Sequence, residues 1–345
     1  MEMTFFQVLW FFLIFLLIAG YFVLDGFDLG AGVLYPFVAK SERDKAVVRR
    51  SIGPVWDGNE VWLLTAGGAL FAAFPPAYAT TFSGFYLAVM LVLFGLIVRA
   101  VSVEFRGHDP QWARTWDACF FVGPLLPALL LGVAVGNIYA GIPMDAAGNY
   151  IGLPLIGLIT PFTLLTGLLG LAMFLAAGAT WIALKAPKPS ELQARAAKLR
   201  LPLQVVALVL FAAVSLYGHF GIQPAMDPAL GVLRWVFALV FVAGIVVSLV
   251  LAKKKDCDKG AFVAQSASAV ALVGLLATSM FPNLVVASAG SIGPNITLMS
   301  AASSELSLMW MTIITCVGLP LVLVYHMIVY RTFRGRVSDD DLGHY

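Results

Sequence analysis

The stretch that decides the fold is FFQVLWFFLIFLLIAGYFVL, which spans Phe5–Leu24 and contains no charged side chain. A helix needs about 20 apolar residues to cross the hydrocarbon core of a bilayer, which is about 30 Å thick. The stretch therefore predicts a membrane-spanning helix near the start of the chain. A secretory signal peptide would begin with basic residues, whereas the residues before this stretch include Glu2 and no Lys or Arg. We therefore expect this helix to be retained.

The rest of the chain shares this composition. Of its 345 residues, 61% are hydrophobic and 12% are charged, and the mean hydropathy is +0.92. A soluble domain carries about 25% charged residues, so this composition excludes a soluble enzyme, a disordered chain and a nucleic-acid binder. The apolar runs are unbroken, whereas the strands of a membrane barrel alternate polar and apolar residues. We therefore expect an all-α integral membrane protein.

Nine apolar runs of this kind follow one another, joined by connections too short to hold an aqueous domain. They predict a single polytopic membrane domain with nine spanning helices. The first helix is expected to continue beyond Leu24 through a glycine-rich segment, and the fifth to begin ahead of Pro161. The expected spans are 5–38, 56–74, 77–98, 118–136, 154–184, 202–222, 229–251, 261–281 and 306–330.

The basic residues test this count, because Lys and Arg favour the cytoplasmic side of a membrane. All of them except Arg234 fall in alternate connections between the expected spans or in the C-terminal tail. The connection after the third span, for example, is expected to hold Arg99, Arg106 and Arg114. This alternation supports nine spans, and it predicts that the N-terminus lies outside and the C-terminus in the cytoplasm.

Four acidic residues lie within or at the edge of the expected spans. Asp25 and Asp28 belong to DGFDLG in the first span, and Asp57 and Glu60 belong to WDGNEVW at the start of the second. The predicted topology brings both pairs to the cytoplasmic side, where partly desolvated carboxylates can pass protons. Two structural alternatives stay open at this point. Asp57 can cap its helix, and Asp28 can be a buried residue bonded to a neighbouring Trp or Ser.

Few residues of the chain are suited to bind a metal or a heme. Axial heme ligands would be His or Met facing the inside of a helical bundle. Only His219 and His326 lie near the expected spans, whereas a pair of hemes needs several inward-facing His residues. The three cysteines form no CxxC pair. We therefore assign no metal ligand on this chain, and His326 is the one residue whose role stays open.

Several motifs resemble subunit II of the cytochrome bd quinol oxidases. The segment DGFDLG at 25–30 is followed by WDGNEVWL at 56–63 and TAGGALFAAFP at 65–75. Similar motifs lie further along the chain, at 114–117, 133–137 and 301–308. The resemblance implies two four-helix bundles plus one peripheral helix, with no heme on this subunit.

The resemblance also implies a heterodimeric terminal oxidase in the cytoplasmic (inner) membrane of a bacterium or archaeon. Its heme-bearing subunit I would hold two b-type hemes and one d-type heme, so no catalytic residue is expected on this chain. Quinol oxidation would be coupled to the reduction of O2 to water with protons from the cytoplasm, which contributes to the proton-motive force without pumping. Membrane lipid and a small single-helix accessory subunit are further candidate partners.

The resemblance further implies roles for individual residues. Part of the family's proton route runs through subunit II, and the matching positions here are Asp28 and Asp57. Asp25 and Glu60 are further candidates for this route, and Trp62 matches the lining of the family's oxygen route. Three residues are candidates for the subunit interface or for packing: Trp56, Gly58 and Asn59.

A stand-alone secondary transporter is the main alternative, with Asp28 and Asp57 as ion-coupling carboxylates. Transporters often place polar residues and broken helices near the middle of the membrane. The later expected spans carry very few such residues, and no substrate-binding cluster is evident. A lipid-embedded scaffold without proton traffic is a third possibility.

Overall fold

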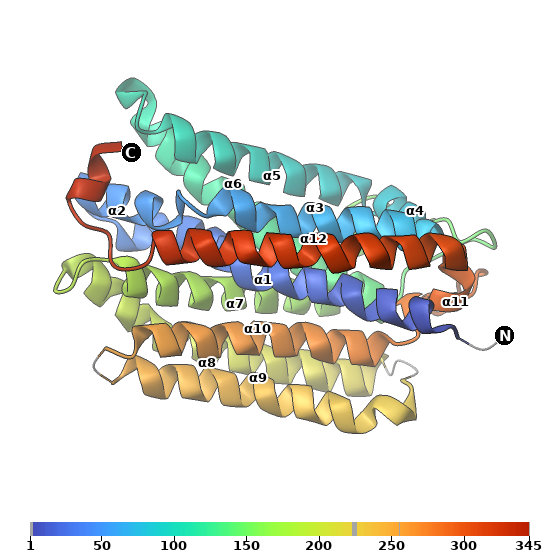
Figure 1. Ribbon diagram of the computed structural model, residues 1–345. Coiled ribbons are helices and arrows are strands. Elements are labelled where there is room, and N and C mark those ends of the chain that lie inside the picture. Colours follow the sequence, from blue (N-terminus) through green and yellow to red (C-terminus); the bar gives the residue numbers. More distant parts are fainter. Residues whose placement is uncertain (1–2, 223–225, 255, 345) are drawn as a thin grey trace.

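The computed structural model describes residues 3–222, 226–254 and 256–344. Its long helices run side by side, and the described ends of the chain lie at opposite ends of the bundle (Figure 1). The long helices are α1 (Phe5–Val38), α3 (Trp56–Ala73), α5 (Tyr86–Phe105), α6 (Ala113–Ala140), α7 (Pro161–Lys185), α8 (Glu191–Tyr217), α9 (Gly231–Ala252), α10 (Asp258–Met280) and α12 (Glu305–Thr332). The shorter elements are α2 (Glu42–Ile52), α4 (Pro75–Gly84), α11 (Leu298–Ala301), β1 (Asn283–Val285), β2 (Ile296–Thr297), η1 (Pro110–Trp112), η2 (Ile156–Leu158), η3 (Gly218–Ile222), η4 (Pro228–Leu230) and η5 (Asp340–His344).

The helices have the length and composition of an integral membrane protein. Within the described residues, eight helices are long and apolar enough to cross a membrane. The remaining expected span, 56–74, corresponds to α3, which is less apolar because its first turns carry Asp57, Asn59 and Glu60. The expected all-α membrane class therefore describes this chain.

Four expected spans differ clearly from the observed helices. The span 118–136 is too short, because α6 runs from Ala113 to Ala140. The span 77–98 is divided, because α4 ends at Gly84 and α5 begins at Tyr86. The span 154–184 begins too early: η2 occupies its start, and α7 starts only at Pro161, behind an N-cap in which Thr160 accepts a hydrogen bond from the Thr163 amide. The span 202–222 begins too late, since α8 starts at Glu191. The last five residues of this span lie beyond α8 and form the π-helical turn η3.

Helix α1 lies at the centre of the fold and packs against α3, α6, α7 and α10. Its closest approach is to α7, where Gly30 and Gly178 face each other. A Cβ atom on Gly30 would lie 1.8 Å from the carbonyl oxygen of Phe174, so only glycine permits this contact. Small residues allow membrane helices to approach this closely. The contact fixes the part of α1 that carries Asp25 and Asp28.

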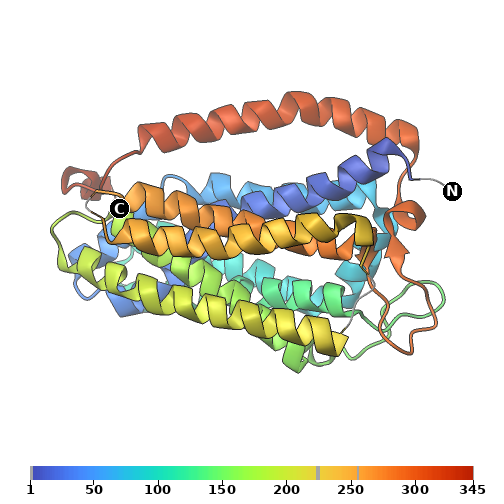
Figure 2. The ribbon, with the colours of Figure 1, turned by 90° about the horizontal axis from the view of Figure 1, so that it is seen from below.

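Helix α12 lies at the edge of the bundle, as seen from below in Figure 2. In the most apolar stretch of 18 residues in α12, only 6% is buried within the chain, although the helix contacts α1 and α3. Most of its surface is therefore free to meet lipid or another protein.

Two polar connections pack together at the end of the bundle that holds the N-terminus. Strand β1 pairs with β2 in an antiparallel arrangement, and Ile142 pairs with Ala287 in an isolated bridge. The connections 141–160 and 281–304 thus form one cap over this end.

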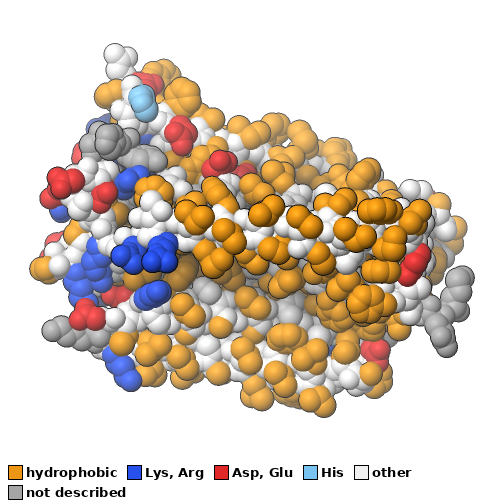
Figure 3. All heavy atoms as spheres, in the orientation of Figure 1, with side chains coloured by type: hydrophobic (Ala, Val, Ile, Leu, Met, Phe, Trp, Pro, Cys, Tyr) orange, Lys and Arg blue, Asp and Glu red, His pale blue; other side chains and the backbone are white. Residues whose placement is uncertain are grey.

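Charged side chains gather at the opposite end, where Figure 3 shows most of the visible Lys and Arg side chains near α2 and the C-terminus. Several are in ion pairs; Asp117, for example, pairs with both Lys45 and Arg106. Two basic residues that were expected in connections, Arg99 and Arg200, lie buried inside long helices. Arg99 was expected in a connection but lies inside α5 and is completely buried, because α5 continues to Phe105 and two acidic residues surround the guanidinium.

Candidate functional site

A buried guanidinium joins three helices beside the glycine contact of α1. Arg99 on α5 donates one hydrogen bond to Asp25 on α1 and another, of 2.9 Å, to Glu60 on α3. Arg99 and Asp25 are fully buried, and the Glu60 side chain is 23% exposed. The planar guanidinium group carries several N–H donors, so one Arg side chain can bond two carboxylates at once. The Trp56 ring centroid lies 5.7 Å from the guanidinium carbon, which places Trp56 in packing against this pair.

The carboxyl group of Asp28 lies one helical turn along α1 from that of Asp25. Asp28 is fully buried and accepts a hydrogen bond of 2.7 Å from the Asn59 side-chain amide. The Asn59 carbonyl in turn accepts from the Tyr330 hydroxyl on α12 at 2.9 Å. Asn59 is therefore a packing residue inside the chain. The alternative partners expected for Asp28, a Trp or Ser, are wrong, because an amide takes that place.

The two aspartates are incompletely bonded. One oxygen of Asp25 and one of Asp28 are buried without a hydrogen-bond partner among the described residues. Buried polar atoms normally have partners, so such exceptions often mark places for water or a proton. Arg99 pairs with Asp25 and Glu60, whereas the third carboxyl group, that of Asp28, is bonded to Asn59 and to no cation among the described residues. The site combines acidic groups with room for a proton, a chemistry suited to proton transfer.

Asp57 lies at the surface near this cluster. It is exposed in the first turn of α3 and makes no side-chain hydrogen bond to the described residues. The N-cap of α3 is Val55, which offers no side-chain bond, so Asp57 does not cap α3 with its side chain; it does lie in the first turn, where an acid interacts favourably with the helix dipole. Gly58 is half-buried, and a Cβ atom there would lie 3.2 Å from the Tyr325 ring of α12. The structure therefore joins Asp25, Asp28 and Glu60, and it leaves Asp57 outside.

Trp62 links α3 to α12 through His326. The indole nitrogen lies 3.2 Å from Nε2 of His326, and Nδ1 of His326 lies 2.9 Å from the Val322 carbonyl oxygen. Because a carbonyl only accepts, Nδ1 carries the hydrogen and Nε2 accepts from the indole. With these bonds, neither ring nitrogen of His326 has a lone pair left for a metal. The described residues contain no group of three or more His, Cys, Asp or Glu that could hold a metal ion.

Sequence reasoning missed Arg99 and Tyr330 as members of this cluster. A signal for Arg99 was available, because two acidic residues in one membrane helix call for a buried cation. Its position directly after the apolar run that ends at Val98 made it resemble a flanking residue instead. Nothing in the sequence links Tyr330 to Asn59, which lies 271 positions earlier.

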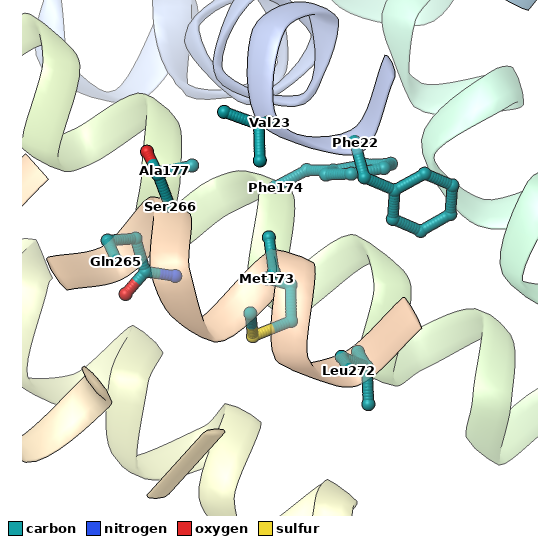
Figure 4. A pocket seen from close by; sticks show the side chains of 9 residues that line it. Phe22, Val23, Met173, Phe174, Ala177, Gln265, Ser266 and Leu272 are labelled. Atoms are coloured by element: carbon teal, nitrogen blue, oxygen red, sulfur yellow. The ribbon is translucent and has the colours of Figure 1, made fainter. Parts of the chain in front are cut away.

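The small cavity shown in Figure 4 lies among α1, α7 and α10, apart from the acidic cluster. Its volume is about 10 Å³, which suits no more than about one water molecule. Gln265 lines it, and the Nε2 atom of this residue is buried without a hydrogen-bond partner among the described residues. This cavity is therefore too small to hold a cofactor.

Comparisons with known proteins agree over nearly the full length. The sequence pattern of the family described as cytochrome bd terminal oxidase subunit II matches residues 6–333. Cytochrome bd ubiquinol oxidase subunit 2 of Bacillus subtilis strain 168 is 36% identical over 335 residues, which cover 96% of each protein. Cytochrome bd-I ubiquinol oxidase subunit 2 of Escherichia coli strain K12 is 33% identical over 368 residues, covering 97% of this chain and 96% of the relative.

A solved structure shares the fold. The bd oxidase from Geobacillus thermodenitrificans superposes with a TM-score of 0.77 and covers 96% of this chain and 99% of the matched chain. The sequence identity in that comparison is 16%, so it concerns the arrangement of the helices alone.

Proposed function

This chain belongs to the cytochrome bd terminal oxidase subunit II family, and we propose that it is the heme-free subunit that carries protons and admits oxygen to a heme-bearing partner. Membership makes it a multi-pass inner-membrane protein and part of a quinol:O2 oxidoreductase complex. The relatives are oxidase subunits, which favours this function over a stand-alone transporter. The single observation that carries the proposal is the buried Asp28, which pairs with no cation among the described residues and lies one helical turn from Asp25, whose carboxyl group shares the Arg99 guanidinium with Glu60.

We infer that the chain crosses the membrane nine times, as two four-helix bundles with α12 at the periphery. Support comes from the described chain ends, which lie at opposite ends of the bundle (Figure 1). The Lys and Arg side chains around α2 and the C-terminus mark that end as cytoplasmic by the positive-inside rule (Figure 3). The acidic cluster then lies towards the cytoplasmic half of the membrane.

In the proposed proton route, Asp57 receives protons at the surface and Asp28 holds them inside. Arg99 cannot serve as a carrier, because a guanidinium does not lose its proton in proteins. Its role is to hold Asp25 and Glu60 in place through its two hydrogen bonds. Asp28 lacks a cationic partner and keeps one oxygen open, which suits a group that is protonated and deprotonated in turn. Glu60, being partly exposed, connects the buried cluster to the surface.

The redox chemistry is proposed to lie on subunit I, which would carry two b-type hemes and one d-type heme. Among the described residues, both ring nitrogens of His326 are engaged in hydrogen bonds and His108 and His219 are exposed, which supports placing the hemes on the partner. Electrons would pass from quinol to O2 on the partner, and the product is water. No step of the electron transfer therefore runs through this chain.

Absorption spectroscopy of the purified native complex tests this function. We expect a heme-bearing partner to copurify, with a d-type heme band and quinol oxidase activity, while this chain separated from it shows no heme absorption. A purified chain that transports a solute and carries no oxidase partner would contradict the proposal.

Trp62 is proposed to line the oxygen route. Its ring lies against the bare backbone of Gly20, where a Cβ atom would come within 2.3 Å of the indole. A smaller ring would widen the path, so Trp62→Phe is expected to lower the KM for O2 by about two- to threefold through faster entry. The KM for quinol should not change. Oxygen-electrode measurements at limiting O2 check this.

The matched control for that experiment is Trp10→Phe. The indole nitrogen of Trp10 also donates to α12, at 3.0 Å to the Leu308 carbonyl oxygen. Trp10 lies near the start of α1, away from the contact of Trp62 with Gly20.

Trp62→Phe loses the N–H that is bonded to His326, and Trp10→Phe loses an N–H that is shared between the Leu308 carbonyl oxygen and the Thr312 hydroxyl. Each change is expected to cost about 1 kcal/mol of stability. An equal change of the KM for O2 in both variants would rule out a specific role of Trp62.

A further inference from the structure

A cavity lies at the end of the bundle where α2, the end of α7 and the chain after α12 meet. Its volume is about 100 Å³. Basic side chains dominate its wall: Arg50 from α2, Lys185 from α7, and Arg334 and Arg336 from the segment after α12. The one acidic residue of the wall is Asp341 in η5. Tyr330, which donates to Asn59 in the acidic cluster, also lines this cavity, but none of the carboxyl groups of the proposed proton route does.

The cavity is held in shape by hydrogen bonds to backbone atoms. Lys185 donates to the carbonyl oxygens of Phe333 and Gly335, at 2.5 and 3.2 Å. Arg336 donates to the carbonyl oxygen of Ala186 at 2.7 Å, and also to Ala183 and Asp258. These bonds tie the segment after α12 to the end of α7. The basic groups are therefore positioned in advance of any ligand.

The positive charge of this wall is only weakly balanced. The Asp341 carboxylate lies 3.8 Å from the Arg50 guanidinium, at the long end of an ion pair. Hydrogen bonds from Ser338 hold the pKa of Asp341 below its usual value, so this residue is a carboxylate at neutral pH. Arg336 is separately paired with Asp258 at 2.8 Å, so one carboxylate faces the other three basic side chains of the wall, and a second anion would be attracted. A tetrahedral oxyanion suits guanidinium groups, which donate in pairs.

The position of the cavity suits a ligand from the membrane surface. Trp181 and Tyr330 also line it, near the ends of α7 and α12. Basic pockets between membrane helices on the cytoplasmic side bind anionic lipid head groups. We propose that this cavity is a binding site for a phosphate group, supplied either by an anionic phospholipid or by free inorganic phosphate.

The test uses the intact complex, stripped of lipid in a neutral detergent, and compares it with the double variant Arg50→Gln/Arg334→Gln. Phosphatidylglycerol is titrated and bound lipid is counted by native mass spectrometry. In a separate titration, inorganic phosphate is added at constant ionic strength and the melting temperature is followed. Removal of two basic groups is expected to weaken binding by roughly thirtyfold. Arg331→Gln is the matched control, because Arg331 lies in the last turn of α12 but outside the cavity wall.

Loss of lipid binding only in the double variant would support the site with a phospholipid as the source. Loss of the phosphate-dependent rise in melting temperature only in that variant would support it with free phosphate. Equal binding by wild type and double variant in both titrations would overturn the proposal, as would an equal loss in Arg331→Gln.

A second variant, Asp341→Asn, is expected to strengthen binding of the phosphate group, and it leaves every basic residue of the wall in place. Asp341→Asn removes the competing charge but keeps an oxygen that can accept the Ser338 hydrogen bonds. This variant should bind phosphatidylglycerol or phosphate about fivefold more tightly, because one nearby negative charge is lost. Unchanged or weaker binding of both ligands would contradict the site.

Discussion

Asp28→Asn is expected to lower quinol-driven oxygen consumption by about a hundredfold, the lower end of what a positioned proton-transfer group contributes. Asparagine keeps the shape of the side chain and an oxygen that can accept the 2.7 Å bond from Asn59. It removes the group that is protonated and deprotonated. The fold and the heme content of the complex should therefore remain, while turnover falls. Oxygen consumption and heme spectra of the same preparation measure both.

The control for this experiment is Asp339→Asn. Asp339 is an exposed acid that pairs with Arg43, with 73% and 52% of the two side chains exposed, and such pairs contribute about 1 kcal/mol or less. This control should consume oxygen at the wild-type rate. Normal turnover in Asp28→Asn would contradict a role in proton transfer. A loss of heme that parallels the loss of activity would show a structural role instead.

Arg99→Gln is expected to abolish most assembly of the complex. Without the guanidinium, Asp25 and Glu60 lose their only cation at this site, and breaking a buried ion pair in this way costs about 3–5 kcal/mol. That cost is comparable to the total stability of many domains. The yield of heme-containing complex and its thermal unfolding measure the effect.

Rescue distinguishes loss of the ion pair from a general packing defect. Adding Asp25→Asn to Arg99→Gln removes one unpaired buried charge, so the double variant should recover part of the yield. Arg43→Gln serves as control, because its partner Asp339 is exposed and the pair contributes little. Wild-type yield and melting temperature in Arg99→Gln would contradict the assigned role of this ion pair.

Much of the fold could be predicted because the length of an apolar run indicates where a membrane-spanning helix begins and ends. The first run shows this, since α1 is continuous from Phe5 to Val38. Local errors arose where backbone chemistry overrides hydropathy. Thr160 and Pro161 start α7 although the residues before them are also apolar. Likewise, α3 lies in a stretch whose acidic and amide side chains lower its hydropathy, because those side chains serve the site.

The site could be predicted only in part, because sequence patterns report which residues are unusual but not what they contact. Asp25, Asp28 and Glu60 stand out as acids at membrane depth, and the structure brings them together. Arg99 was misplaced because a basic residue at the end of an apolar run is usually in a flanking connection. The Trp62–His326 hydrogen bond joins residues 264 positions apart, and no periodicity connects them.

The central claim is that protons reach the oxygen-reducing partner through Asp28. Time-resolved proton uptake by the complex in sealed vesicles, followed with a pH indicator on the side of α2 after a pulse of O2, tests it most directly. The account predicts that Asp28→Asn slows uptake by about a hundredfold, while electron transfer within the reduced complex begins at the wild-type rate. Uptake at the wild-type rate in a heme-complete Asp28→Asn complex would contradict the claim.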